Sequence, residues 1–166
     1  MRIHNITTDD MLNGVGLRVV LWVSGCSHHC KNCHNPVTWD ENDGILFTQE
    51  TEDELFSKLN KPYIKGITFS GGDPFHINNR DEIRRLSEKI KQTFPEKDIW
   101  VYTGYTWEEL WNELSDPESY LINIDVLVDG RYIEELADRN LRWVGSSNQR
   151  TINVQKSLGV NEESKE

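Results

Sequence analysis

The chain has 166 residues, of which 36% are hydrophobic and 10% aromatic, so it can bury the core of a single domain without disulfides. Its formal charge of -10 at pH 7 disfavours non-specific binding to nucleic acid, because phosphate backbones repel a negative surface. No stretch approaches the roughly 20 apolar residues of a membrane span, and the N-terminus lacks the features of a secretory signal. We therefore expect a cytoplasmic protein with no nucleic-acid or membrane partner, with one domain over 1–158 and a disordered acidic tail over 159–166.

The first predicted element is a buried strand over 17–23, which is apolar and rich in β-branched residues. All three cysteines of the chain lie in the loop that follows this strand. There Cys26, Cys30 and Cys33 form a CxxxCxxC pattern. A [4Fe-4S] cluster is usually closed by four thiolates, so this set leaves one iron without a protein ligand. An open metal position of this kind is where catalysis can take place.

Other interpretations of the cysteines stay open on spacing alone. Three thiolates and one histidine also make a closed structural zinc site, and His28, His29 and His34 lie near enough in sequence to supply the histidine. A non-catalytic zinc-binding module is therefore one alternative, and a simple electron carrier is another. Disulfides are disfavoured by the odd cysteine count and the expected reducing compartment. His28 and His29 are themselves more typical of solvent-exposed loop residues than of ligands.

Helices and strands alternate through the rest of the chain. Capping-box patterns at Thr51 and Thr106 predict the starts of two helices. Between these two helices, apolar residues at helical spacing predict an amphipathic helix over 81–93. Short apolar runs predict three more strands, over 66–69, 99–102 and 124–128. The alternation predicts an α/β fold with a mainly parallel sheet, and the length allows only an incomplete (β/α) barrel of the TIM type.

A polar or glycine-rich loop follows each predicted strand: SGC, SGGDP, TGY and DG in chain order. Because the carboxyl ends of parallel strands meet at one edge of a sheet, we expect these loops to surround one site. Gly71 and Gly72 would let the backbone approach a ligand closely, and Asp73 could accept hydrogen bonds from an ammonium group. An ordinary turn in which Asp73 caps the next helix is the alternative for this segment.

The cysteine pattern and the GGDP loop together resemble the radical S-adenosylmethionine (SAM) superfamily, in which the methionine part of SAM chelates the open iron. The resemblance is closest to the activating proteins of the anaerobic ribonucleoside-triphosphate reductase. It rests on the segments NGVGLRVVLWVSGCSHHCKNCHNPVTWD, ITFSGGDPF, DIWVYTGYTWEEL, IDVLVDGRY and LRWVGSSNQR, which cover most of the chain between residues 13 and 150.

The resemblance implies a radical SAM fold and two cofactors, SAM and one [4Fe-4S] cluster held by Cys26, Cys30 and Cys33. It implies an oxidoreductase that cleaves SAM reductively and uses the 5′-deoxyadenosyl radical to generate a glycyl radical on the reductase. The implied partners are that reductase, in a hetero-oligomer that could contain a homodimer of this chain, and an electron donor such as a flavodoxin. A pyruvate formate-lyase activator and a deazaguanine-forming enzyme are the alternatives within the superfamily.

The resemblance also implies which residues contact SAM. Asn32 stands where the superfamily often has an aromatic residue, so an adenine contact there would come from the backbone. Thr103 and Asp129 end two predicted strands, where they also fit as ordinary cap or turn residues. The expected contacts are Gly71, Gly72 and Asp73 with the methionine amino group, Asn32, Cys33 and His34 with adenine, and Thr103, Gly104 and Asp129 with the ribose or the methionine carboxylate.

Overall fold

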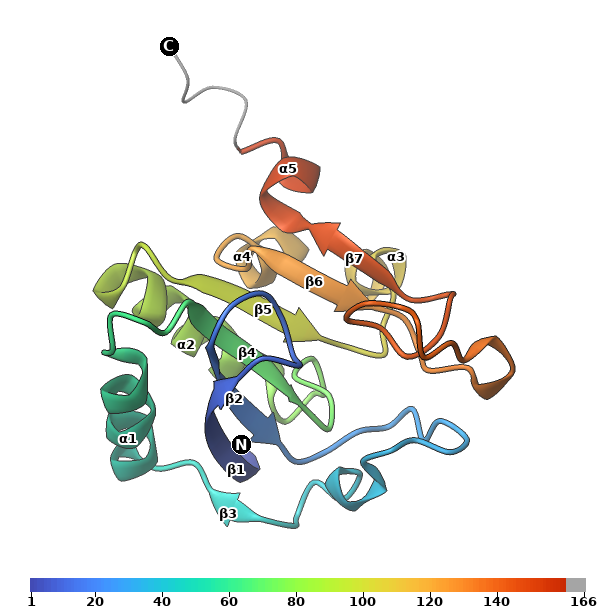
Figure 1. The fold of residues 1–166 in the computed structure, drawn as a ribbon, viewed down its shortest axis with the longest axis horizontal. Helices are drawn as coiled ribbons and strands as arrows, with labels where there is room; N and C mark the ends of the chain where they lie inside the picture. The colour runs from blue at the N-terminus through green and yellow to red at the C-terminus, as the bar shows by residue number, and fades with distance from the viewer. Residues whose placement is uncertain (161–166) are drawn as a thin grey trace.

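A computed structural model describes residues 1–160, which form one seven-stranded sheet with helices packed against it (Figure 1). The strands lie in the order β3-β1-β2-β4-β5-β6-β7. They are β1 (Arg2–Asp10), β2 (Arg18–Val23), β3 (Ile45–Leu46), β4 (Gly66–Gly71), β5 (Asp98–Tyr102), β6 (Val126–Asp129) and β7 (Arg150–Asn153). The helices are α1 (Gln49–Leu59), α2 (Arg80–Thr93), α3 (Trp107–Glu113), α4 (Pro117–Leu121) and α5 (Val154–Leu158), with short 3₁₀ helices η1 (Pro36–Thr38) and η2 (Glu134–Leu136).

The predicted α/β class is confirmed, and the sheet is open and mixed. The four central strands, β2, β4, β5 and β6, run parallel in chain order, whereas β1, β3 and β7 are antiparallel to their neighbours. Three of the six strand pairs are therefore antiparallel, so the expected mainly parallel sheet describes only the centre. None of the helices within residues 1–160 has the length and apolar character needed to cross a bilayer.

Most predicted elements match the observed ones to within about two residues, which is the usual uncertainty of helix and strand ends. The capping box at Thr106 is confirmed, because its side chain accepts a hydrogen bond from the Glu109 backbone N–H. The capping box predicted at Thr51 is wrong. Thr48 caps α1 instead, and the Thr51 hydroxyl takes the N3 role usually filled by Glu or Gln. No strand is predicted from the sequence at β1, β3 or β7.

Alternate residues of the central strands point to opposite faces of the sheet, as the pleat requires. One set is fully buried against the helices and includes Leu21, Phe69, Val101 and Leu127. The helices contribute buried residues to the same core cluster, among them Leu55, Leu59, Ile83, Leu86, Ile90, Leu110 and Leu121. The helices thus cover one face of the sheet.

The other face is only partly covered, by loops instead of helices. In Figure 1 the loop between β1 and β2 crosses in front of this face. Below this loop, Arg18 is fully buried; its guanidinium lies 2.6 Å from the Asp98 carboxylate and donates to Thr68 Oγ1. Trp100 and Trp143 pack edge to face nearby, with ring centroids 5.6 Å apart. These contacts close the end of the face where the parallel strands begin and leave the end where they finish open.

The C-terminal boundary of the domain can be followed only in part. Helix α5 ends at Leu158, and Gly159 takes the left-handed conformation that commonly stops a helix, with φ of 75°. Of the predicted tail over 159–166, residues 161–166 lie outside the described residues.

Candidate iron-sulfur and cofactor site

The loops that follow the four parallel strands surround one cavity of about 140 Å³. Cys26 comes from the loop after β2, Gly72 from the loop after β4, Gly104 from the loop after β5 and Gly130 from the loop after β6. The parallel strands produce this convergence, because their carboxyl ends lie at the same edge of the sheet. The loops predicted from the sequence to share a site do so.

Cys26, Cys30 and Cys33 all line this cavity, and each is a free thiol. The backbone of their loop is held by hydrogen bonds to the segment around η1, among them Cys26 N to the Trp39 carbonyl at 3.1 Å. The loop reverses direction at His29 and Asn32, which have φ of 49° and 56°. Asparagine tolerates this left-handed conformation better than most residues, which suits it to position 32.

Burial raises the pKa of the Cys26 thiol to about 11 and raises the pKa of Cys30 as well. Without a bound cation these two thiols therefore stay protonated at neutral pH. A metal ion binds the thiolate and displaces the proton, so its charge offsets the burial that disfavours the anion. Three thiols that line one cavity without forming disulfides suit a cluster of soft metal ions, and the donor set fits a [4Fe-4S] cluster with one iron left open.

Asp73 is the centre of a buried hydrogen-bond network beside the cysteines; its exposed fraction is 1%. Its Oδ1 accepts from the Phe75 backbone N–H at 2.8 Å, and its Oδ2 accepts from the Gly104 backbone N–H at 2.9 Å. The Thr103 hydroxyl donates to the same carboxylate at 2.8 Å, and His28 Nε2 lies 2.7 Å from Oδ2. One carboxylate therefore joins the loops after β2, β4 and β5.

The prediction that His28 is solvent-exposed is wrong, because only 5% of its side chain is accessible. Its ring packs edge-on against Tyr105 with centroids 4.6 Å apart and also lies against Gly104. A side chain on Gly104 would clash with this ring, since an added Cβ would lie 2.4 Å from His28 Cδ2. By contrast, His29 is exposed and stacks on Trp39, as expected of a loop residue.

Replacing Asp73 by asparagine is expected to lower the free energy of unfolding by about 2 kcal/mol, although the shape is conserved. Each carboxylate oxygen accepts a backbone N–H, so the amide nitrogen of asparagine would face a donor in either orientation. Thermal unfolding followed by circular dichroism measures the change. Asp116→Asn is the matched control, because Asp116 caps α4 and asparagine caps helices equally well. Equal melting temperatures for the two variants would contradict the assigned role of Asp73.

Gly71 and Gly72 are required by the backbone that surrounds them. Gly71 has φ of 102°, and a Cβ there would lie 2.7 Å from the Val23 backbone. At Gly72 an added Cβ would lie 2.5 Å from the Gly25 carbonyl oxygen, while the Gly72 N–H donates to the Val23 carbonyl at 2.7 Å. The GGD segment is thus packed directly on the backbone that leads into the cysteine loop.

The remaining predicted site residues differ in where the structure places them. His34 and Thr103 line the cavity with the cysteines. The Asn32 side chain is exposed and donates to Glu134 of η2. Asp129 does not line the cavity either; its carboxylate accepts from the Trp107 backbone N–H at 2.8 Å and from Arg150 Nε at 3.0 Å.

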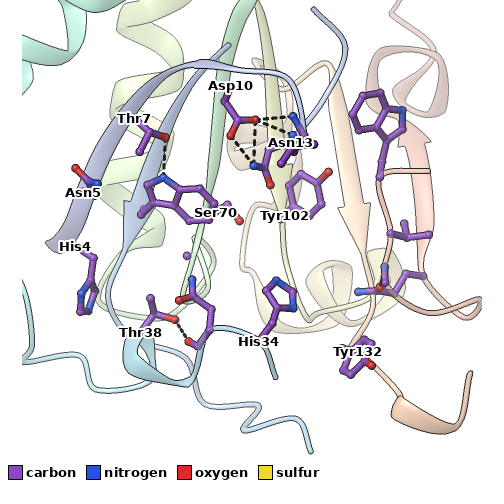
Figure 2. Close-up of a pocket in the computed structure, with 18 of the residues that line it drawn as sticks. His4, Asn5, Thr7, Asp10, Asn13, His34, Thr38, Ser70, Tyr102 and Tyr132 are labelled. Carbon is purple, nitrogen blue, oxygen red and sulfur yellow. Dashed lines mark hydrogen bonds between the residues drawn. The ribbon is translucent and has the colours of Figure 1, made fainter. Parts of the chain in front are cut away.

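A second, larger cavity of about 810 Å³ opens beside the first, on the face of the sheet that the helices leave free (Figure 2). The two share a wall that includes His34, Ser70, Tyr102, Tyr132 and Gln149. None of the last three is among the site residues predicted from the sequence. The pleat places Ser70 and Tyr102 on this face, but no spacing in the sequence indicates that Tyr132 and Gln149 reach it.

The comparisons with known proteins agree with this geometry. The family described as "4Fe-4S single cluster domain" matches residues 12–152. The relatives include the anaerobic ribonucleoside-triphosphate reductase-activating protein of Enterobacteria phage T4, which is 46% identical over 90% of this chain and 92% of its own length. The proteins of the same name from Vibrio cholerae serotype O1 and Escherichia coli strain K12 are 44% and 46% identical, over 90% of this chain and 96% of theirs.

The chain belongs to this family of activating proteins. The resemblance to the activating proteins, which rests on five segments of the sequence, is therefore confirmed, and so is the presence of a 4Fe-4S domain. In the structure, the three cysteines of this domain lie beside the GGD segment.

Proposed function

We propose that this protein activates an anaerobic ribonucleoside-triphosphate reductase by generating a glycyl radical on it, with SAM and one [4Fe-4S] cluster as cofactors. A cluster held by Cys26, Cys30 and Cys33 and reduced by a donor such as a flavodoxin would supply the electron that cleaves SAM at the bond between its sulfonium and the adenosyl carbon, giving methionine and a 5′-deoxyadenosyl radical. The protein would direct this radical to the α-carbon of one glycine of the reductase. Transfer of a hydrogen atom from that carbon to the radical would leave 5′-deoxyadenosine and a glycyl radical. We place this activity in the cytoplasm.

The proposal rests on one cavity that three free thiols share with the GGD segment, in a chain whose relatives are named activating proteins. Cys26, Cys30 and Cys33 would hold three irons and leave the fourth for SAM. The parallel strands β2, β4, β5 and β6 are adjacent in chain order, which is the arrangement of a (β/α) barrel. We infer that the open sheet is a partial barrel of the radical SAM type.

The residues around the cysteines would bind and orient SAM in different ways. Gly71 and Gly72 bring the backbone close to the thiols, so we propose that they hold the methionine part through main-chain groups. The Asp73 carboxylate already accepts from two backbone N–H groups, Thr103 and His28, which favours a role in holding the loops in place. Direct contact of Asp73 with the amino group stays a prediction, as does contact of Asp129 with the cofactor.

His34 lies in the wall between the two cavities, where its backbone could reach adenine. The Asn32 side chain is turned away toward Glu134, so any contact from that residue would come from its main chain. A glycine suits the role of substrate, because a partner segment with no side chain at the reacting position can pass along the open face of the sheet and enter a narrow site.

Anaerobic reconstitution with iron and sulfide tests the proposal. We expect a brown protein that, once reduced with dithionite in the presence of SAM, releases 5′-deoxyadenosine. Adding the reductase should then produce a glycyl radical signal in electron paramagnetic resonance. No 5′-deoxyadenosine from cluster-loaded protein would overturn the SAM chemistry, whereas 5′-deoxyadenosine without a glycyl signal would point to another small radical enzyme.

A zinc-binding module is the second candidate, and one observation favours it. Donor atoms of Cys26, His28 and Asp73 lie within 4.8 Å of one another, a spacing that could hold a metal ion. The contact of 2.7 Å between His28 and Asp73 already accounts for this grouping as a hydrogen bond. Zinc analysis separates the two candidates, because the module predicts a colourless protein with stoichiometric zinc after anaerobic purification.

A further inference from the structure

The larger cavity is lined by groups that hydrogen-bond without carrying a fixed positive charge. Its walls contain no lysine or arginine among the described residues, so it lacks the cations that hold phosphate or carboxylate ligands. Its polar side chains include the amides of Asn5 and Asn35 and the hydroxyls of Ser70 and Tyr102, which can meet a backbone N–H or C=O. Three others, Thr7, Asn13 and Gln149, already hydrogen-bond within the chain. Trp22 and Trp143 supply apolar surface between them. This lining is suited to a peptide segment.

Tyr102 occupies a distinctive place in this lining. It ends β5 and lies in the wall that the large cavity shares with the cysteine cavity. Its hydroxyl oxygen is buried and has no hydrogen-bond partner in the part of the chain that the structure describes. Leaving a buried hydroxyl unpaired costs about 1–3 kcal/mol, so such a group in a cavity wall points to a ligand that completes it.

The charged groups near Tyr102 are committed to other partners. The Asp10 carboxylate, on the same side of the cavity in Figure 2, accepts from the backbone N–H groups of Leu12 and Asn13 and from the Asn13 side chain. Arg18 is a donor, and its guanidinium is paired with Asp98. Burial raises the pKa of Tyr102, so the phenol stays protonated and can donate a hydrogen bond.

We propose that Tyr102 is a positioning residue whose hydroxyl donates to a backbone carbonyl of the reductase segment that carries the attacked glycine. The inference rests on the proposed function and adds where the partner segment lies: along the open sheet face, between Tyr102 and Trp143. The shared wall is the reason for the choice, because a segment bound there would enter the cysteine cavity from the side of the large one. The cluster would occupy the smaller cavity, which the three cysteines line.

Tyr102→Phe tests this proposal, because it removes one oxygen atom and keeps the ring. One neutral hydrogen bond corresponds to roughly a two- to tenfold effect, so we expect KM for the reductase to rise by that factor. We also expect fewer glycyl radicals per 5′-deoxyadenosine released, because a misplaced glycine competes poorly with other fates of the radical. Tyr63→Phe is the control, since Tyr63 is 57% exposed and lines neither cavity.

Four outcomes separate the possibilities. A higher KM for the reductase and a lower ratio of glycyl radical to 5′-deoxyadenosine, with the cluster absorbance retained, would support the proposal. An unchanged ratio and KM would overturn it, and so would a change confined to KM for SAM, which would assign the hydroxyl to the cofactor. If the unmodified protein releases no 5′-deoxyadenosine, the proposed function itself fails, which is a separate result.

Discussion

Cys30→Ala is expected to abolish the release of 5′-deoxyadenosine and to leave the reconstituted protein without its [4Fe-4S] absorbance. Cys30 is one of only three thiols in the chain, and all three line the same cavity, so no other cysteine can replace it. Changes to groups that merely support metal ligands cost about 10- to 100-fold in affinity or activity, and loss of a ligand should cost more. Iron and sulfide analysis with product chromatography measures both effects.

The control for this experiment is Lys31→Ala, in the same loop. The Lys31 side chain is 74% exposed and its ion pair with Glu134 lies at the surface, where such pairs contribute little. It should therefore retain iron and activity. If Cys30→Ala kept a full complement of iron and cleaved SAM at the normal rate, the assignment of the three cysteines would be wrong. Equal far-UV circular dichroism spectra for the two variants would exclude unfolding as the cause of a loss.

The centre of the fold could be predicted from the sequence because its strands are short, almost wholly apolar runs. The residues of β2 are nearly all buried on both faces, which leaves an unmistakable apolar pattern. The antiparallel strands carry no such pattern: only Ile3 of β1 is buried, β3 has two residues, and β7 is mostly exposed. Strand β1 pairs with β2, β3 pairs with β1, and β7 pairs with β6, and local sequence does not encode these pairings.

The site could be predicted as far as its loops but not as far as its side-chain contacts. The parallel strands bring the cysteines and the GGD segment together, and both motifs are visible in the sequence. The burial of His28 depends on Asp73, Gly104 and Tyr105, which lie 45 or more residues away. The Asp73 carboxylate already accepts hydrogen bonds from neighbouring loops. How much of it is left to accept from an ammonium group depends on how three loops pack, which the sequence does not show.

Gly72→Ala is expected to lower the free energy of unfolding by about 3 kcal/mol and to reduce the iron bound after reconstitution. The added methyl group would lie 2.5 Å from the Gly25 carbonyl oxygen and 2.9 Å from that of Thr38. Neither can move freely: the first accepts from the Asp73 N–H and the second from the Gly25 N–H, both at 2.7 Å. Relief of the clash therefore has to displace the backbone that leads into Cys26.

Gly159→Ala provides the comparison, because nothing lies within 4 Å of an added Cβ there and only its left-handed φ of 75° opposes the change. That strain should cost about 1 kcal/mol and leave iron binding intact. At roughly 2–4 °C per kcal/mol for a chain of this size, melting temperatures should separate the two variants by several degrees. Equal melting temperatures and equal iron contents for Gly72→Ala and Gly159→Ala would contradict this prediction. The GGD segment would then have room for a methyl group, and its close packing on the cysteine loop would not be what fixes the cluster site.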